Sequence, residues 1–232
     1  MAAATADDLF EEIEALSRAV ASKLWALEDK TRSTTRLIWP KSRKGTLRVS
    51  EQEARILFCH ELENSPRWYY SVETPTREIY HHENKELSAR VDLSLYEGID
   101  SKEPCVNIEF KCNNPASPGF EHDFEKLLRE EPRSVWFSVI ERQALLPPVL
   151  KSISAAFASL DKTHNSLSTL NREVLFQLCI LESGRQKLFQ GRLPLDDTLR
   201  GSLRNIDLFF TEERLRLPSG GWRRFSPSVY PA

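Results

Sequence analysis

The sequence predicts an α/β protein, in which one mixed α+β sheet is flanked by helices. Segments with apolar residues at three- and four-residue spacing, typical of amphipathic helices, are interspersed with segments of alternating apolar and polar residues, typical of half-buried strands. The 232 residues leave room for one substantial core. A composition of 40% hydrophobic and 28% charged residues is ordinary for a soluble globular protein.

The N-terminal part, residues 1–47, is expected to be an amphipathic helix followed by a basic linker. The helix covers residues 6–30, with acidic residues near its start, where the helix dipole favours them. Its apolar stripe consists of Leu9, Ile13, Leu16, Val20, Leu24 and Leu27. This stripe needs a partner surface, either the rest of the chain or a second subunit, so a homodimer is one expectation.

The basic linker contains no acidic residue between positions 30 and 48. Its cations are Lys30, Arg32, Arg36, Lys41, Arg43, Lys44 and Arg48. A run of this kind is usually a solvated segment, and it also suits contacts with phosphates. The net charge of -2 gives no overall basic bias, so only this clustering favours a nucleic acid as partner.

The central part of the chain predicts the order helix, three strands, helix, strand. Ser50 and Glu53 fit a capping box that opens a helix ending near position 63. Strands are expected at 68–73, 89–96 and 105–112, a helix at 120–130, and a buried strand at 135–140. The polar segment 78–86, with His81, His82 and Glu83, is expected to be a loop.

C-terminal additions complete the predicted domain, which spans residues 48–217. They are a helix at 149–160, a hairpin formed by 174–181 and 186–189, and a strand at 206–210. Residues 218–232, rich in proline and glycine, are expected to form a loose tail or one that orders on contact.

Compartment and membrane relations follow from the cysteines and the apolar stretches. Cys59, Cys105, Cys112 and Cys179 are scattered without a Cys-x-x-Cys pair, which indicates reduced thiols. No stretch approaches the roughly 18 to 20 apolar residues that span a bilayer. The first residues lack the basic region of a secretory signal. We therefore expect a cytoplasmic protein without membrane association.

Two of the expected strands carry charged residues that could form a catalytic or metal-binding site. In strand 89–96, Asp92 lies on the polar face, and in strand 105–112, Glu109 and Lys111 share the polar face because side chains alternate. If both strands turn their apolar faces to one core, two carboxylates converge beside one ammonium group. Such a pair suits Mg²⁺, which is commonly held by one or two carboxylates with water and phosphate. The alternative is an ordinary solvated Glu-Lys face.

The segments VDLSLY (91–96), NIEFKCN (107–113) and HDFEKLL (122–128), with the helix before them, resemble the core of the PD-(D/E)XK nuclease superfamily. The resemblance covers residues 48–142. It implies a restriction-endonuclease-like fold, with Asp92 and Glu109 as metal ligands and Lys111 as the catalytic lysine. Val91 stands where the proline of the family's name would be.

Some members of that superfamily also use a glutamate of the first helix. Glu51 and Glu53 are the candidates, and helical geometry favours Glu51 because it precedes Ala54 and Phe58 on the core-facing stripe. Glu51 is thus the third expected metal ligand. The acid Glu73, at the end of the first strand, is a further candidate.

Three other polar groups could have a function or a purely structural role. His81 and His82, followed by Glu83, superficially suggest a transition-metal site, but a solvated loop is the better interpretation of this polar segment. His122 precedes a helix, where it could reach a phosphate or simply lie on the surface. Asn113 and Asn114 follow the strand that carries Glu109, where turn chemistry explains them as well as substrate contact does.

Together these observations predict a Mg²⁺- or Mn²⁺-dependent nuclease that cleaves DNA by in-line attack of a metal-activated water. The alternative is a catalytically inactive nucleic-acid-binding or assembly protein on the same fold. The residues leave open DNA or RNA, sequence specificity and the biological role.

Overall fold

The computed structural model describes residues 6–28, 35–45, 47–82, 85–113, 118–130, 133–163, 172–195, 209–217 and 221–227. Its sheet contains β1 (Tyr69–His82), β2 (Lys85–Tyr96), β3 (Val106–Cys112), β4 (Arg133–Ile140), β5 (Arg172–Ile180), β6 (Lys187–Leu195) and β7 (Trp222–Phe225). The helices are α1 (Ala6–Glu28), α2 (Glu51–Glu63), α3 (Pro118–Arg129), α4 (Leu146–Thr163) and α6 (Glu212–Arg216), with a 3-10 turn at Gln143–Leu145.

The sheet is mixed, and its seven strands follow one another in chain order. β1, β2 and β3 pair antiparallel, β3, β4 and β5 pair parallel, and β5, β6 and β7 pair antiparallel again. The parallel centre requires crossover connections, which α3 and α4 provide. The predicted class, a mixed sheet with flanking helices, is confirmed.

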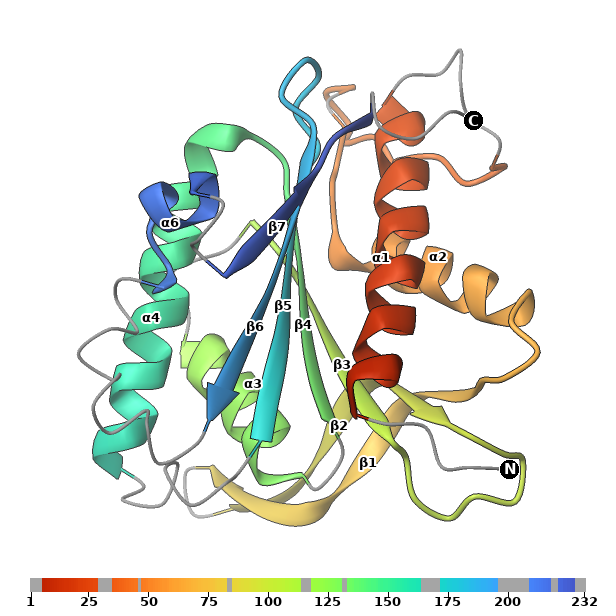
Figure 1. The fold of residues 1–232 in the computed structure, drawn as a ribbon, viewed down its shortest axis with the longest axis vertical. Coiled ribbons are helices and arrows are strands. Elements are labelled where there is room, and N and C mark those ends of the chain that lie inside the picture. Colours follow the sequence, from red (N-terminus) through yellow and green to blue (C-terminus); the bar gives the residue numbers. More distant parts are fainter. Residues whose placement is uncertain are drawn as a thin grey trace.

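Two helical layers cover the two faces of the sheet (Figure 1). On one face lie α1 and α2, where the Phe58 ring packs edge-on against Phe110 and Phe137 at centroid distances of 5.2 and 5.3 Å. On the other face lie α3 and α4, where Phe124 stacks on Trp136 at 4.1 Å. Strand alternation therefore gives every central strand two buried faces.

Ser50 is the N-cap of α2, as predicted, although Ser50 and Glu53 bond through their side chains and not through the backbone N–H groups of a capping box. The Ser50 side chain accepts a hydrogen bond from the Gln52 backbone N–H, and its hydroxyl donates to Glu53 at 2.6 Å. Acids in the first turn also complement the helix dipole. Local contacts of Ser50 thus fix where the helix begins.

Helix α1 packs on the sheet of its own chain. Ile13, Val20 and Leu24 are fully buried, and the Trp25 indole donates a 2.8 Å hydrogen bond to the Ile180 carbonyl of β5. The apolar stripe that suggested a dimer is therefore covered within the chain. In the basic segment, Arg36, Lys41, Arg43, Lys44 and Arg48 are exposed, whereas Lys30 and Arg32 lie outside the described residues.

The loop expected at 78–86 is instead the end of a long hairpin. β1 and β2 continue to the pairs His81–Glu86 and His82–Lys85. The ladder is made by backbone groups, so a hairpin with polar side chains can extend beyond the apolar core. The expectation of a loop was wrong because it used side-chain polarity alone.

The C-terminal region also differs from the expectation. Positions 206–208 of the expected strand lie outside the described residues, and Phe209 is helical with Phe210 in a turn; a short apolar run does not distinguish a strand from a helix. The tail was expected to be loose or to order on contact, and its residues Trp222–Phe225 are ordered as β7, which pairs with β6. Trp222 of β7 is 5% exposed and covers Gly191, where a Cβ atom would lie 2.6 Å from the indole.

Two further expectations concern the cysteines and the membrane. All four cysteines are free thiols, as predicted. Within the described ranges, no helix has the length and apolar character needed to cross a membrane.

Candidate functional site

The predicted acids lie where the ladder between β2 and β3 opens. Antiparallel pairing runs through Leu95–Val106 to Leu93–Ile108 and then stops. One step further, Asp92 and Glu109 would face each other. There the Asp92 Oδ2 atom accepts a 2.8 Å hydrogen bond from the Phe110 backbone N–H, so a side chain takes the place of the backbone partner. Both carboxylates belong to the face that α3 covers.

Glu109 is 1% exposed and stands among other charges. Burial, and next the repulsion by Asp92, hold the pKa of Glu109 well above its usual range, although Lys126 opposes this shift. The Glu109 Oε1 atom lies 2.7 Å from the Lys126 ammonium, yet it accepts no hydrogen bond of good geometry from the described residues. Lys126 is therefore the cation that compensates this buried carboxylate oxygen.

Helix α3 contributes Asp123 and Lys126 to the same group of charges, which together with Asp92, Glu109 and Lys111 is called the acid cluster. The Asp123 carboxylate lies 2.5 Å from the Lys111 ammonium and 2.8 Å from that of Lys126. Their spacing of three residues brings both to one side of the helix, next to the buried Phe124. The sequence analysis gave these two residues no role, although this spacing beside an apolar stripe was a usable signal.

Lys111 is held as a cation by the cluster. Burial lowers its pKa, but Asp123 and Glu109 outweigh this effect, so the pKa of Lys111 is raised. Its ammonium lies 4.0 Å from Glu109, and its side chain remains 27% exposed. Asp92, Glu109 and Lys111 are therefore brought together, with Lys111 directed to the accessible side.

A second positive group reaches Asp92 from α2. The Arg55 guanidinium lies 3.7 Å from Asp92 Oδ1 and also binds Glu73. Glu73 stands between the pairs Val72–Leu93 and Thr74–Val91, opposite Asp92, with a positive φ of 53°. That backbone conformation is unfavourable for a residue with a side chain. Arg55 thus lies between Glu73 and Asp92 and contacts both.

No hydrogen bond or ion pair links Glu51 to Asp92 or Glu109 among the residues that the structure describes. Glu51 is the first residue of α2. Burial is the main cause that raises the pKa of the Cys112 thiol to about 12, and the negative charges of Glu51, Glu141 and Glu53 raise it further. The Cys112 thiol bonds the Val49 carbonyl at 3.4 Å, so this corner lies on the α2 side of β3. Glu53, the other candidate, is buried against Ser50.

The donor set was compared with the needs of a divalent cation. Among the residues that the structure describes, no three His, Cys, Asp or Glu side chains form a metal-holding group. Mg²⁺ needs less than that, because one or two carboxylates suffice when water and phosphate complete its shell. Asp92 and the incompletely bonded Glu109 fit this minimal pattern.

The remaining polar candidates have structural roles or lie elsewhere. Asn113 accepts a hydrogen bond from the Glu141 backbone N–H at 2.7 Å and donates to the carboxylate of the same residue at 3.3 Å, so it ties the end of β3 to the end of β4. His122 lies near the start of α3 and is partly buried. The side chains of His81 and His82, and all of Asn114, are outside the described residues.

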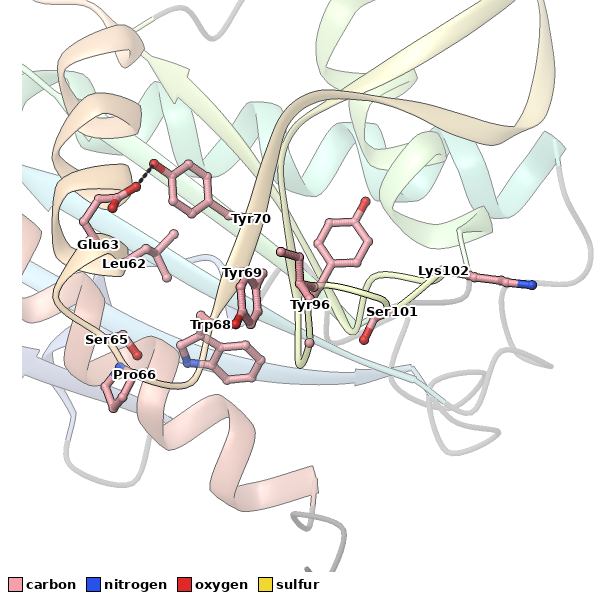
Figure 2. A pocket seen from close by; sticks show the side chains of 12 residues that line it. Leu62, Glu63, Ser65, Pro66, Trp68, Tyr69, Tyr70, Tyr96, Ser101 and Lys102 are labelled. Atoms are coloured by element: carbon pink, nitrogen blue, oxygen red, sulfur yellow. Dashed lines mark hydrogen bonds between the residues drawn. The ribbon is translucent and has the colours of Figure 1, made fainter.

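A hollow of about 780 Å³ lies apart from the acid cluster. It is formed by the end of α2, the start of β1 and the loop after β2 (Figure 2). Tyr69 and Tyr96 pair across the two strands there, and the Tyr70 hydroxyl donates a 2.6 Å hydrogen bond to Glu63. Asp92, Glu109 and Lys111 are not among its lining residues.

Comparison with known proteins gives no relative: no family model, no curated protein and no solved structure matches this chain.

Proposed function

We propose that this protein is a metal-dependent nuclease that hydrolyses phosphodiester bonds in DNA. One observation carries the proposal: Asp92 and Glu109 converge where the β2–β3 ladder opens, with Lys111 on the same face. The element order α2, β1, β2, β3, α3, β4 supports a restriction-endonuclease-like core, as the sequence resemblance implies.

The residues of the cluster divide the work. Asp92 and Glu109 would hold Mg²⁺ or Mn²⁺, which when bound lowers the pKa of water and offsets charge on the phosphate. The Phe110 backbone N–H fixes the Asp92 carboxylate at 2.8 Å. Lys111, oriented by Asp123, stands where an ammonium can stabilise negative charge that develops on the attacked phosphate.

The exposed cations of the segment before α2 suit the nucleic-acid backbone. Arg36, Lys41, Arg43, Lys44 and Arg48 project from this segment. Contacts of this kind are independent of sequence and weaken as salt rises. We expect binding to DNA to depend on these residues and cleavage to depend on the acid cluster.

A second candidate function is favoured by the charge balance of the cluster. The carboxylates of Asp92, Glu109 and Asp123 stand among the cations Lys111, Lys126 and Arg55, and Arg55 also binds Glu73. A cluster whose carboxylates already have cations beside them also suits a protein that binds nucleic acid or assembles with partners and does not catalyse. This is the alternative against which the nuclease is tested.

The test is cleavage of supercoiled plasmid, linear DNA and RNA with Mg²⁺ or Mn²⁺. Wild type is compared with Lys111→Ala and with Lys151→Ala, an exposed lysine of α4. The nuclease requires cleavage by wild type and the Lys151 variant, and none by the Lys111 variant. Failure of all three proteins to cleave, together with unimpaired binding of nucleic acid, would favour the second function.

A further inference from the structure

We infer that Lys126 is a built-in cation that occupies part of the metal position and limits how tightly the cluster binds a divalent ion. This inference rests on the proposed metal site and concerns its regulation. Lys126 is not one of the residues to which the sequence resemblance assigns a role.

The surroundings of the Lys126 ammonium are those of a bound cation. Three oxygen atoms lie around Nζ: Glu109 Oε1 at 2.7 Å, Asp123 Oδ1 at 2.8 Å and the Arg90 carbonyl at 2.8 Å. Carboxylate and carbonyl oxygens are the atoms that hard cations choose as ligands. The ammonium therefore takes up the same oxygen atoms that an ion at Glu109 would use.

Burial makes this contact important for charge balance. The Lys126 side chain is 8% exposed, and Glu109 beside it is 1% exposed. A charge removed from water in this way is stable only with a partner of opposite sign. Without Lys126, Glu109 would face Asp92 and Asp123 with one ammonium fewer, and a divalent ion would then be the available compensation.

Lys111 and Lys126 have different positions in the cluster. Lys111 contacts Asp123 at 2.5 Å but lies 4.0 Å from Glu109, and it is 27% exposed. Lys126 bridges Glu109 and Asp123 from inside α3. Lys111 is thus placed toward a substrate, whereas Lys126 competes for the carboxylate oxygen that has no well-formed hydrogen bond.

The experiment is calorimetric titration of the full chain with Mn²⁺. Lys126→Met removes the charge at similar length, and Lys126→Gln retains a donor for the Arg90 carbonyl in case the first variant does not fold. Either variant should bind Mn²⁺ with a Kd at least about tenfold lower than wild type, because a competing cation has been removed. Adding Glu109→Gln to either variant should abolish the gain.

The matched control is Lys23→Met. Lys23 forms a 2.5 Å ion pair with Glu61 between α1 and α2, and the Glu61 oxygen also has no hydrogen bond within the described part of the chain. Its Mn²⁺ affinity should equal that of wild type. A Kd for the Lys126 variants that is unchanged or higher, or absence of binding by all proteins, would overturn the inference.

The inference and the proposed function fail separately. If wild type cleaves DNA and the Lys126 variants bind Mn²⁺ no more tightly, the inference is wrong and the nuclease stands. If the variants bind Mn²⁺ more tightly and wild type does not cleave, Lys126 is the competing cation in a site that performs no hydrolysis.

Discussion

Two glutamates, Glu14 of α1 and Glu109 of β3, are each 1% exposed, but their surroundings differ. Glu14 is a single acid between two arginines: its Oε1 atom lies 3.0 Å from Arg192 Nε, and its Oε2 atom binds Arg223. Both oxygens are therefore paired. Glu109 also has a cation, with Lys126 Nζ 2.7 Å from its Oε1 atom, but it stands beside a second carboxylate, Asp92.

This difference distinguishes a cluster that stabilises the fold from a cluster that could bind a metal or catalyse a reaction. The Glu14 cluster joins α1 to β6 and β7, three elements far apart in the sequence, and its partners satisfy it. The Glu109 cluster brings three carboxylates together among cations, and the repulsion between the carboxylates costs stability; such crowding is typical of functional sites. Burial of a single acid therefore does not indicate a functional site. Two acids that are crowded together in a buried position do indicate one.

The largest expected contrast is in activity. Asp92→Asn should lower the rate of plasmid cleavage by about a hundredfold or more, because it removes negative charge from the metal site. Glu14→Gln, assayed at a temperature where it is folded, should retain the wild-type rate. Initial rates of nicking with Mg²⁺ measure both. Full activity of the Asp92 variant would show that Asp92 is not part of the active site.

Stability should show the reverse order. Glu14→Gln should lower the free energy of unfolding by about 2–4 kcal/mol, since two arginines lose their shared buried partner. Asp92→Asn should change it by less than about 1 kcal/mol, because a repulsion with Glu109 is lost together with a hydrogen bond. Urea titration compares the two. A larger loss for Asp92→Asn would mean that the acid cluster holds the fold together.

A smaller effect is expected at the junction of β6 and β7. Gly191→Ala places a Cβ atom against the Trp222 ring and should cost about 1–3 kcal/mol through overpacking. Since Arg223 follows Trp222, the double variant with Glu14→Gln should be less destabilised than the sum of the two single changes. Gly98→Ala, whose Cβ would lie 3.4 Å from Ser101 Oγ, is the control. An additive result would separate Trp222 from the Glu14 cluster.

The smallest effect is a pH dependence measured in EDTA. The pKa of Glu109 is raised above 4.5 in the folded protein, by burial first and Asp92 second. The folded state therefore holds this proton more tightly than the unfolded state, and its stability falls as pH rises above about 4.5 toward the folded pKa. Glu109→Gln lacks this loss, so its stability relative to wild type should increase over that range in urea titrations. A constant difference across pH would contradict the raised pKa.

Local pattern was sufficient to predict much of the fold and the first part of the site. Period-two alternation predicted that Asp92, Glu109 and Lys111 share a face, because pleating alone determines which way a side chain points. The Ser50 cap predicted where α2 begins, for a similarly local reason. The conformation of neighbouring residues decides both features.

The remaining features depend on partners distant in the sequence. Arg55 and Lys126 enter the cluster from α2 and α3, and their roles follow from the packing of those helices on the sheet. The strand Trp222–Phe225 forms because β6 offers a free edge with a glycine under the indole. Its four residues carry too little periodicity to indicate a strand by themselves.

The central claim is that Asp92 and Glu109 form a metal site, and the most direct measurement is the anomalous difference map of crystals grown with Mn²⁺. The account predicts a peak within coordination distance of both carboxylates in wild type and none in the Asp92→Asn, Glu109→Gln double variant. A wild-type map without a peak at these residues, from crystals that hold Mn²⁺ elsewhere, would contradict it.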